Sequence, residues 1–246
     1  MRVIVNGASG RMGKELIASI TLGYCGTELA AAVDITLPEC DCPCYTSLAD
    51  VTENADVLID FSHHSATDKV LAFALDRKMP TVIATTGQTE EEKAAIEDAS
   101  RKIPLFYSGN MSIGIALLVT LVKTAIQVFP DADVEIVETH HNQKLDVPSG
   151  TALMIAKGIE NVRQNTTFCI GRHENGKRPA GEVGIHSIRM GKVVGIHEVI
   201  INTGSQTLTL KHEAHSRALF AEGALKAAEY LRDQTAGLYS VGDLFV

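Results

Sequence analysis

The sequence predicts an α/β protein in which a doubly wound parallel sheet is followed by a second α+β domain built on a mixed sheet. In residues 1–110, short apolar runs alternate with helical patterns, which is typical of a parallel sheet covered by helices on both faces. Beyond residue 111, the runs alternate polar and apolar residues between glycines, which favours mixed or antiparallel strands. With 246 residues and 45% hydrophobic content, the chain can form two modest cores.

The first strand leads into a glycine loop. "RVIV" at residues 2–5 is typical of a strand buried on both faces, and "NGASGRMG" follows it with Gly7, Gly10 and Gly13. Residues 12–20 then carry apolar side chains at helical spacing. A strand, a GxxGxxG loop and a helix form a variant of the dinucleotide-binding pattern, because glycines allow the tight turn and bring bare backbone to the pyrophosphate.

An acidic residue supports the same interpretation. Asp34 ends the second predicted strand, 21 positions after Gly13, where an acceptor for a ribose hydroxyl belongs. The sequence therefore predicts a Rossmann-type domain that binds NADH or NADPH. Ile35 stands where an NADP-binding protein often has arginine, which favours NADH slightly, although Arg11 or Lys14 could reach a 2'-phosphate.

Polar tips end three further predicted strands. These are "FSHH" at 61–64, "ATTG" at 84–87 and "SGNM" at 108–111. Ligands of parallel sheets bind at the carboxyl ends of strands, so we expect these tips to border the cofactor cleft. For His63 and His64, a solvated pair of loop residues is an equally good interpretation.

The segment "ETHHNQKLDVPSGTA" at 138–152 predicts a second site. A strand carries His140 and His141 to its end, Lys144 follows, and a helix is expected from Thr151 with Ser149 as its N-cap. Amides at that helix start, at Gly150 and Thr151, would face an anion. Anion-binding amides, a cation and groups that titrate near neutrality suit a reaction on a small carboxylate, so the sequence suggests a hydride-transfer enzyme.

Charge and hydropathy restrict the partners. A net charge of -8 argues against nucleic acid and anionic membranes as partners, but allows a local cationic pocket for a small dicarboxylate. The N-terminus lacks an export signal, which predicts a cytoplasmic protein. The apolar run 113–128 contains Lys123 and is too short to span a bilayer, which favours a buried helix.

The five cysteines are expected to be thiols. Three of them crowd into "CDCPC" as Cys40, Cys42 and Cys44. Zinc sites usually pair two CxxC motifs, and only Cys25 and Cys169 remain here, so the sequence favours a cysteine-rich surface loop over a metal site.

The chain resembles the dihydrodipicolinate reductase family, whose members are also called 4-hydroxy-tetrahydrodipicolinate reductases. The motifs are co-linear over nearly the whole chain: "NGASGRMG", "DVLIDFS", "ATTG", "GNMSIG", "HHNQKLDVPSGTA", "GIHSIRMGKVVGIHEV", "SRALFAEGALKAAEYL" and "GLY". The resemblance implies a dinucleotide-binding domain at 1–110, a substrate-binding and oligomerisation domain at 111–216 and a C-terminal segment at 217–246 that returns to the first domain. It also implies a homotetramer.

The resemblance further implies the reaction and the site. The expected reaction is NADH- or NADPH-dependent reduction of 4-hydroxy-tetrahydrodipicolinate, with loss of water, to tetrahydrodipicolinate in the diaminopimelate route to lysine. Hydride would reach ring C4, and His140 or Lys144 would supply the proton. The implied substrate-binding residues are His141, Ser149, Gly150 and Thr151. The implied cofactor-binding residues are Gly7, Ala8, Ser9, Gly10, Arg11, Met12, Asp34, Ala84, Thr85, Thr86, Ser108, Gly109, Asn110 and Met111.

Two other functions fit the same residues. One is a nicotinamide-dependent reductase of similar layout that acts on a different small acid or imine. The other is a sensor that binds a dinucleotide without catalysis, but a sensor has no need of His140 and Lys144 beside an anion site.

Overall fold

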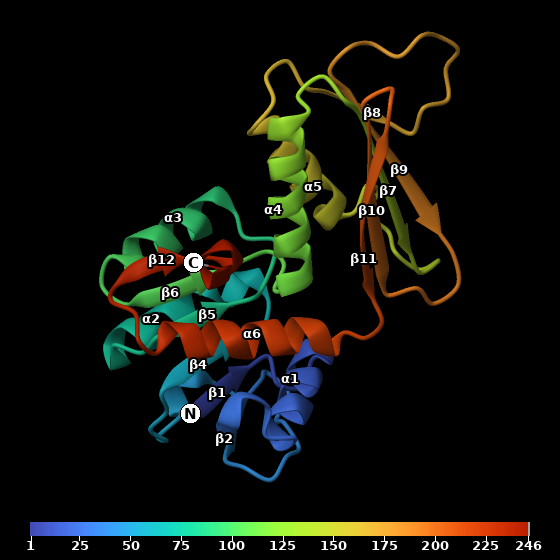
Figure 1. The fold of residues 1–246 in the computed structure, drawn as a ribbon. Helices are drawn as coiled ribbons and strands as arrows, with labels where there is room; N and C mark the ends of the chain where they lie inside the picture. The colour runs from blue at the N-terminus through green and yellow to red at the C-terminus, as the bar shows by residue number, and fades with distance from the viewer. Residues whose placement is uncertain (246) are drawn as a thin grey trace. The chain divides into compact units, whose positions relative to one another are not determined.

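The computed structural model describes residues 1–245, which form two compact units. Of the described residues, unit 1 comprises 1–113 and 217–245, and unit 2 comprises 114–216. Figure 1 follows the chain from the N-terminal strands through unit 2 and back to unit 1 with the C-terminal helix.

Unit 1 is built on a parallel sheet of seven strands. Their order across the sheet is β12-β6-β5-β4-β1-β2-β3, and every neighbouring pair is parallel. The strands are β1 (Arg2–Asn6), β2 (Glu28–Val33), β3 (Cys44–Tyr45), β4 (Val57–Asp60), β5 (Thr81–Ile83), β6 (Pro104–Tyr107) and β12 (Gly237–Tyr239). From β1 the chain first adds β2 and β3 on one side of the sheet and then β4, β5 and β6 on the other. Doubly wound sheets bind ligands at such a switch point.

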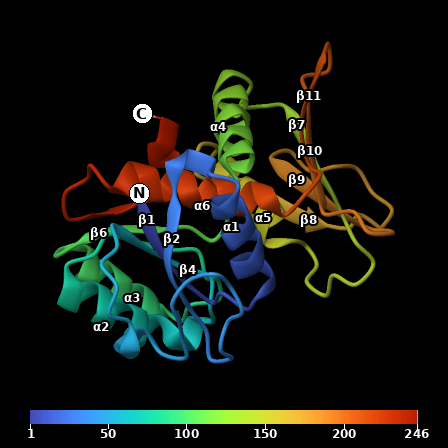
Figure 2. The same cartoon turned by 90° about the horizontal axis from the view of Figure 1, so that it is seen from below.

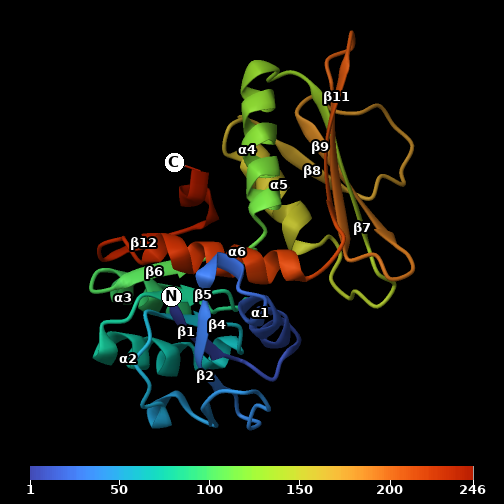
Figure 3. The ribbon, with the colours of Figure 1, turned by 60° about the horizontal axis from the view of Figure 1, so that its bottom comes forward.

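Helices cover both faces of this sheet. On one face, α1 (Arg11–Thr21) lies beside α6 (Ala218–Leu231), and on the other α2 (Thr67–Arg77) lies beside α3 (Glu90–Ser100). Short 3-10 turns occur at η1 (Tyr24–Gly26), η2 (Leu48–Asp50), η3 (His64–Ala66) and η4 (Val241–Phe245). Figure 3 shows the two helix layers with the strands between them.

Small residues let α6 lie close to its neighbours within unit 1. Ala221, Ala224 and Ala228 are fully buried, and a Cβ on Gly223 would lie 1.8 Å from the Met111 carbonyl oxygen. Because β12 follows α6 and pairs with β6, the C-terminal segment completes the first sheet. The sequence pattern predicts α6 but not β12, since "GLY" is too short to show a period.

Unit 2 has a mixed sheet of five strands in the order β11-β10-β7-β9-β8. The pairs of β7 with β9 and of β8 with β9 are parallel, whereas β10 is antiparallel to β7 and β11. The strands are β7 (Asp133–His140), β8 (Thr167–Ile170), β9 (Glu182–Arg189), β10 (Gly195–Asn202) and β11 (Thr207–Ala214). The helices α4 (Ile113–Val128) and α5 (Gly150–Glu160) cover one sheet face, as Figure 2 also shows.

The predicted fold class is confirmed, including the parallel first sheet and the mixed second sheet. The core of unit 2 joins α4 and α5 to the sheet through side chains such as Val122, Ile155, Ile136 and Val199. The apolar run 113–128 is α4, as expected. Over residues 1–245, we find no helix with the length and hydropathy needed to cross a bilayer.

Candidate active site

The end of β7 brings a histidine and a carboxylate together. Glu138 and His140 are two residues apart, so they point to the same side of the strand. The Glu138 side chain is fully buried, and its Oε2 lies 2.5 Å from His140 Nδ1. With the carboxylate as acceptor, Nδ1 carries the proton of a neutral imidazole and Nε2 is left to exchange a proton with a ligand.

Arg189 at the end of β9 neutralises the buried carboxylate. Its guanidinium donates two hydrogen bonds to Glu138, at 2.8 and 2.9 Å, and a third to the Asp146 carbonyl oxygen at 2.8 Å. Burial alone would raise the pKa of Glu138, but the hydrogen bonds from Arg189 and His140 lower it to about 2. Glu138 is therefore ionised at neutral pH and holds His140 in a fixed orientation.

His140 is neutral in the free protein. Burial lowers its pKa below the usual 6.5, and the attraction of Glu138 is opposed by the positive charges of Lys144 and Arg189. A bound polyanion would add negative charge to this region and raise the pKa of His140 again. The residue can therefore gain a proton when an anion binds beside it.

Ser149 connects this cluster to the start of α5. Its hydroxyl caps the helix by accepting from the Ala152 amide at 3.2 Å, and its own amide donates to Glu138 Oε1 at 3.2 Å. A Cβ on Gly150 would meet nothing within 4 Å, so the first turn of the helix is accessible to a ligand. These features fit the predicted anion site, with Thr151 in the first turn.

Lys144 lies in the loop between β7 and α5. Its Nζ is 2.9 Å from the Asp146 carboxylate, and its side chain is 21% exposed, so the ammonium group is within reach of solvent and ligand. The loop is turned back on itself, because the Lys144 amide donates to the carbonyl oxygen of His141 at 3.2 Å. His141 is half-buried at the beginning of this loop.

His197 is a site residue that the sequence analysis missed. It lies on β10, its Nε2 is 3.1 Å from Ser149 Oγ, and its ring meets His140 edge-on at a centroid distance of 5.1 Å. Burial, together with the nearby His140, lowers the pKa of His197 to about 3, so it stays neutral. Glu138 and Arg189 were also missed, although Glu138 could have been found from its position two residues before His140 on the same strand.

The predicted dinucleotide loop joins β1 to α1 in unit 1. Gly7 has φ +81°, and a Cβ on it would lie 2.5 Å from the Phe61 backbone. A Cβ on Gly13 would lie 2.1 Å from the Gly7 carbonyl oxygen, so helix and loop are in contact at that point. The Ser9 amide donates to Asp34 Oδ2 at 3.0 Å, which brings the acidic residue to the loop. These residues fit a dinucleotide with its pyrophosphate on the loop and its ribose near Asp34.

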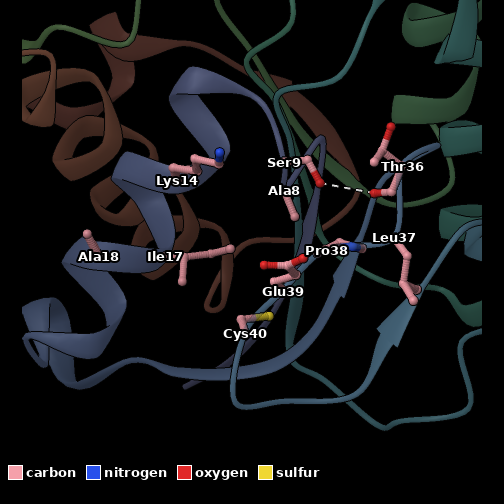
Figure 4. A pocket seen from close by; sticks show the side chains of 10 residues that line it. All are labelled: Ala8, Ser9, Lys14, Ile17, Ala18, Thr36, Leu37, Pro38, Glu39 and Cys40. Carbon is pink, nitrogen blue, oxygen red and sulfur yellow. Dashed lines mark hydrogen bonds between the residues drawn. The ribbon is translucent and has the colours of Figure 1, made fainter.

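A cavity of about 510 Å³ lies beside this loop. Figure 4 shows that Ser9 and Lys14 approach it from the loop and α1, while Thr36 and Cys40 approach it from the segment after β2. Its full lining is Ala8, Ser9, Lys14, Ile17, Ala18, Thr36, Leu37, Pro38, Glu39 and Cys40. Lys14 and Glu39 place one positive and one negative charge on the cavity wall, whereas Arg11 does not line it.

A second buried carboxylate ties three strand ends together. Asp60, at the end of β4, accepts hydrogen bonds from Asn6 at 2.7 Å, from Ser62 at 2.6 Å and from Thr85 at 2.6 Å. The network fixes the carboxyl ends of β1, β4 and β5 with respect to one another. No local sequence pattern marks Asp60, because its partners Asn6 and Thr85 lie 54 and 25 residues away along the chain.

The other predicted cofactor residues differ in exposure. Ala84 and Thr85 are buried after β5, whereas Thr86 is exposed. After β6, Ser108 Oγ donates to the Asn110 carbonyl oxygen at 2.8 Å, and Met111 is buried. His64 pairs with Glu92 at 3.1 Å and keeps 32% of its side chain exposed, and His63 is exposed. All predicted cofactor residues are in unit 1, and all predicted catalytic and substrate residues are in unit 2.

The chain matches one family along both of its parts. Residues 1–111 match the family described as "Dihydrodipicolinate reductase, N-terminus", and residues 114–245 match "Dihydrodipicolinate reductase, C-terminus". The chain belongs to the dihydrodipicolinate reductase family. The predicted membership and enzyme class are thereby confirmed.

Individual members of the dihydrodipicolinate reductase family are similar to this chain over nearly its whole length. The chain is 46% identical over 246 residues to a 4-hydroxy-tetrahydrodipicolinate reductase of Caldanaerobacter subterraneus subsp. tengcongensis, covering 99% of this chain and 98% of the relative. The corresponding protein of Clostridium novyi is 40% identical, with 99% and 97% coverage. A dipicolinate-bound dihydrodipicolinate reductase from Paenisporosarcina sp. TG-14 has a TM-score of 0.83 at 27% identity, covering 98% of this chain and 97% of that one.

Proposed function

We propose that this chain reduces 4-hydroxy-tetrahydrodipicolinate, with loss of water, to tetrahydrodipicolinate in the diaminopimelate route to lysine. The observation that carries the proposal is the arrangement of His140, held by Glu138, beside Lys144 and the start of α5. A dicarboxylate substrate needs cationic and amide donors, and a reduction needs a proton source. The full-length similarity to proteins named as this reductase supports the same reaction.

In the proposed mechanism, the residues of unit 2 bind one end of the substrate and protonate it. The amides at Gly150 and Thr151 and the side chain of His141 bind carboxylate groups. His140 Nε2 takes up a proton as the dianion binds, or Lys144 gives its proton directly, while the charge of Lys144 stabilises the negative charge that develops on the ring. Glu138 and Arg189 keep His140 in place without entering the reaction.

The residues of unit 1 fit a reduced nicotinamide dinucleotide, which supplies the hydride to ring C4 when bound. The glycine loop would hold the pyrophosphate, and Asp34 would accept a hydrogen bond from the adenosine ribose. Asp34 followed by Ile35 favours NADH, whereas Lys14 on the cavity wall offers a partner for the 2'-phosphate of NADPH. We expect both coenzymes to be used, with a small preference for NADH.

We further propose that residues 111–216 serve for substrate binding and for assembly into a homotetramer. Supporting this, α4 and α5 cover only one face of the mixed sheet. Glu135 and Val137 alternate on β7 with the core residues Val134 and Ile136 and therefore face the other side, where a second copy could pack. Sedimentation of the purified protein checks the assembly.

The deciding experiment follows oxidation of NADH and of NADPH by the purified protein while a dihydrodipicolinate synthase makes the substrate from pyruvate and aspartate semialdehyde. We expect turnover that disappears when the synthase is omitted. If either coenzyme binds but neither is consumed, the proposal is wrong, and a different imine substrate or a sensor becomes the better explanation. Titration of each coenzyme by fluorescence separates these two outcomes from failure to bind the dinucleotide.

A further inference from the structure

Three cysteine side chains meet on the segment between β2 and β3. The Sγ atoms of Cys40 and Cys42 are 3.2 Å apart, and those of Cys40 and Cys44 are 3.4 Å apart. All three sulfur atoms lie within 4.8 Å of one another, and all three residues are half-buried. Cys25 and Cys169 do not belong to this group.

The backbone holds the three thiols on one side of a short, anchored loop. Cys44 lies opposite Ala32 in the ladder between β2 and β3, and the Ala32 amide donates to the Pro43 carbonyl oxygen at 3.0 Å. At the other end, Pro38 is buried. Residues 40–42 form a bend that leads into β3 at Cys44, and this bend brings the three sulfur atoms together.

This spacing matches what a single thiophilic cation requires. A Zn–S bond is about 2.3 Å, so two sulfur ligands of a tetrahedral zinc ion lie about 3.8 Å apart. The observed separations of 3.2 and 3.4 Å, within an outer limit of 4.8 Å, reach that value with shifts of a few tenths of an ångström. Thiolates select Zn²⁺ and other soft ions over Mg²⁺ or Ca²⁺. The half-exposed position leaves room for water as a fourth ligand.

A disulfide explains the arrangement less well. A disulfide joins two sulfur atoms at about 2.0 Å and would leave the third thiol of the cluster without a function. In the structure, Cys40 is close to both other cysteines at once. This arrangement suits three sulfur atoms that bind one ion better than two cysteines that form a disulfide.

We propose that Cys40, Cys42 and Cys44 bind one zinc ion through three thiolates, with water completing the coordination. Each thiol loses its proton to solvent as the metal–sulfur bond forms. This replaces the interpretation of the segment as a plain surface loop. Because Cys40 also lines the cavity beside Ser9 and Lys14, the bound ion would fix the wall formed by residues 36–40. Neither His140 nor Lys144 takes part in the zinc site, so zinc binding can be measured without the proposed reaction.

The test starts from metal-free protein under a phosphine reductant and adds Zn²⁺. We expect one zinc per chain, a rise in Tm, and protection of the cluster from iodoacetamide, so that the reactive thiols fall from five to two, namely Cys25 and Cys169. Peptide mass spectrometry locates the protected residues in the unaltered protein, so this readout does not depend on the folding of any variant.

Matched variants separate this cluster from other zinc ligands. Cys42→Ser and Cys44→Ser should lower zinc affinity by at least about 100-fold, since the loss of even an outer-shell partner costs about 10- to 100-fold. Cys25→Ser and Cys169→Ser should bind zinc as the unaltered protein does. Zinc that binds equally well to Cys42→Ser, or no protection of residues 40–44, would overturn the proposal. Loss of two cluster thiols in air, without zinc protection under reductant, would overturn it in favour of a disulfide.

Discussion

At the scale of single residues, His140 and Lys144 are expected to affect turnover. His140 is buried and held by Glu138, so a substitution removes a positioned proton donor without opening the surface. We expect His140→Gln and Lys144→Ala each to lower kcat by about 10²- to 10⁴-fold, the usual contribution of general acid catalysis. Steady-state kinetics with substrate made in situ gives the values.

A change at the start of α5 provides the comparison. Thr151→Val should mainly raise the substrate KM, because its proposed contact binds substrate and transition state alike. Normal kinetics in all three variants would rule out the assignment of the active site to this loop. A lower kcat for Thr151→Val with unchanged KM would move that residue into the catalytic group.

Arg189 contributes stability as well as orientation. Glu138 is fully buried, and Arg189 donates two hydrogen bonds to it with only 18% of its own side chain exposed. Arg189→Met leaves the carboxylate buried without its cation, which costs about 3 to 5 kcal/mol when a buried pair is broken. We expect that loss in the free energy of unfolding, measured by urea denaturation.

The matched control for Arg189 is a surface ion pair. Lys226 and Glu229 are 2.8 Å apart on α6, with about 44% of each side chain exposed. Lys226→Gln should therefore cost less than about 1 kcal/mol. If the double variant Arg189→Met, Glu138→Leu regains no stability over Arg189→Met, the unpaired carboxylate is not the cause of the loss.

At the scale of elements, Gly13 sets the distance between α1 and the loop after β1. A Cβ at this position would lie 2.1 Å from the Gly7 carbonyl oxygen and 2.7 Å from Ala8 Cα, both backbone atoms that cannot turn away. Gly13→Ala should destabilise the chain by about 1 to 3 kcal/mol, as overpacking does, and weaken binding of both coenzymes. Thermal unfolding and fluorescence titration measure the two effects.

Gly150→Ala, at the start of α5, is the control for Gly13→Ala. Like Gly13 in α1, Gly150 lies in the first turn of its helix, α5, but an added Cβ there meets nothing within 4 Å. It should fold normally and bind coenzyme normally. Equal destabilisation by both substitutions would mean that the contact with the Gly7 carbonyl oxygen is not the cause.

The first turns of α1 offer two cations, and only one of them lines the cavity. Lys14 does so, whereas Arg11 does not. A charge-assisted hydrogen bond to the 2'-phosphate is worth about 1.5 kcal/mol or more, so Lys14→Gln should lower kcat/KM for NADPH about tenfold and leave that for NADH nearly unchanged. Arg11→Gln should change neither coenzyme by more than about twofold. Equal losses for both coenzymes after Lys14→Gln would exclude a role in recognising the 2'-phosphate.

At the scale of the whole molecule, the sequence predicts what local patterns carry and misses what distant strands bring together. The loop at Gly7 and Gly13 and the capped helix start at Ser149 were predictable because their signals are contiguous in the chain. His197 and Arg189 were not, because they reach His140 and Glu138 only through strands that are paired in the mixed sheet. Glu138 is intermediate, since strand periodicity places it beside His140 but cannot say that Arg189 neutralises it.

These buried groups make the stability of the chain depend on pH in two ranges. His197 has a folded-state pKa of about 3, below its usual 6.5, so the unfolded chain binds more protons as pH falls through 6.5 and stability is lost towards pH 3. The pKa of Glu138 is about 2, below its usual 4.5, so the stability it contributes is present above pH 4.5 and is lost as pH falls towards 2. The histidine effect therefore comes first on acidification.

Between pH 6.5 and 4.5, the buried His197 and His140 and the half-buried His212 account for this loss, because desolvation lowers the pKa of each. We expect Tm to fall across this range and the fall to be smaller in His197→Gln, whose amide can still bond to Ser149 but does not titrate. Calorimetry at matched ionic strength measures both slopes. His186→Gln is the control, because His186 is half-exposed and pairs with Glu135 at 2.8 Å. Parallel curves for the unaltered protein and His197→Gln would show that His197 is accessible to protons in the folded state.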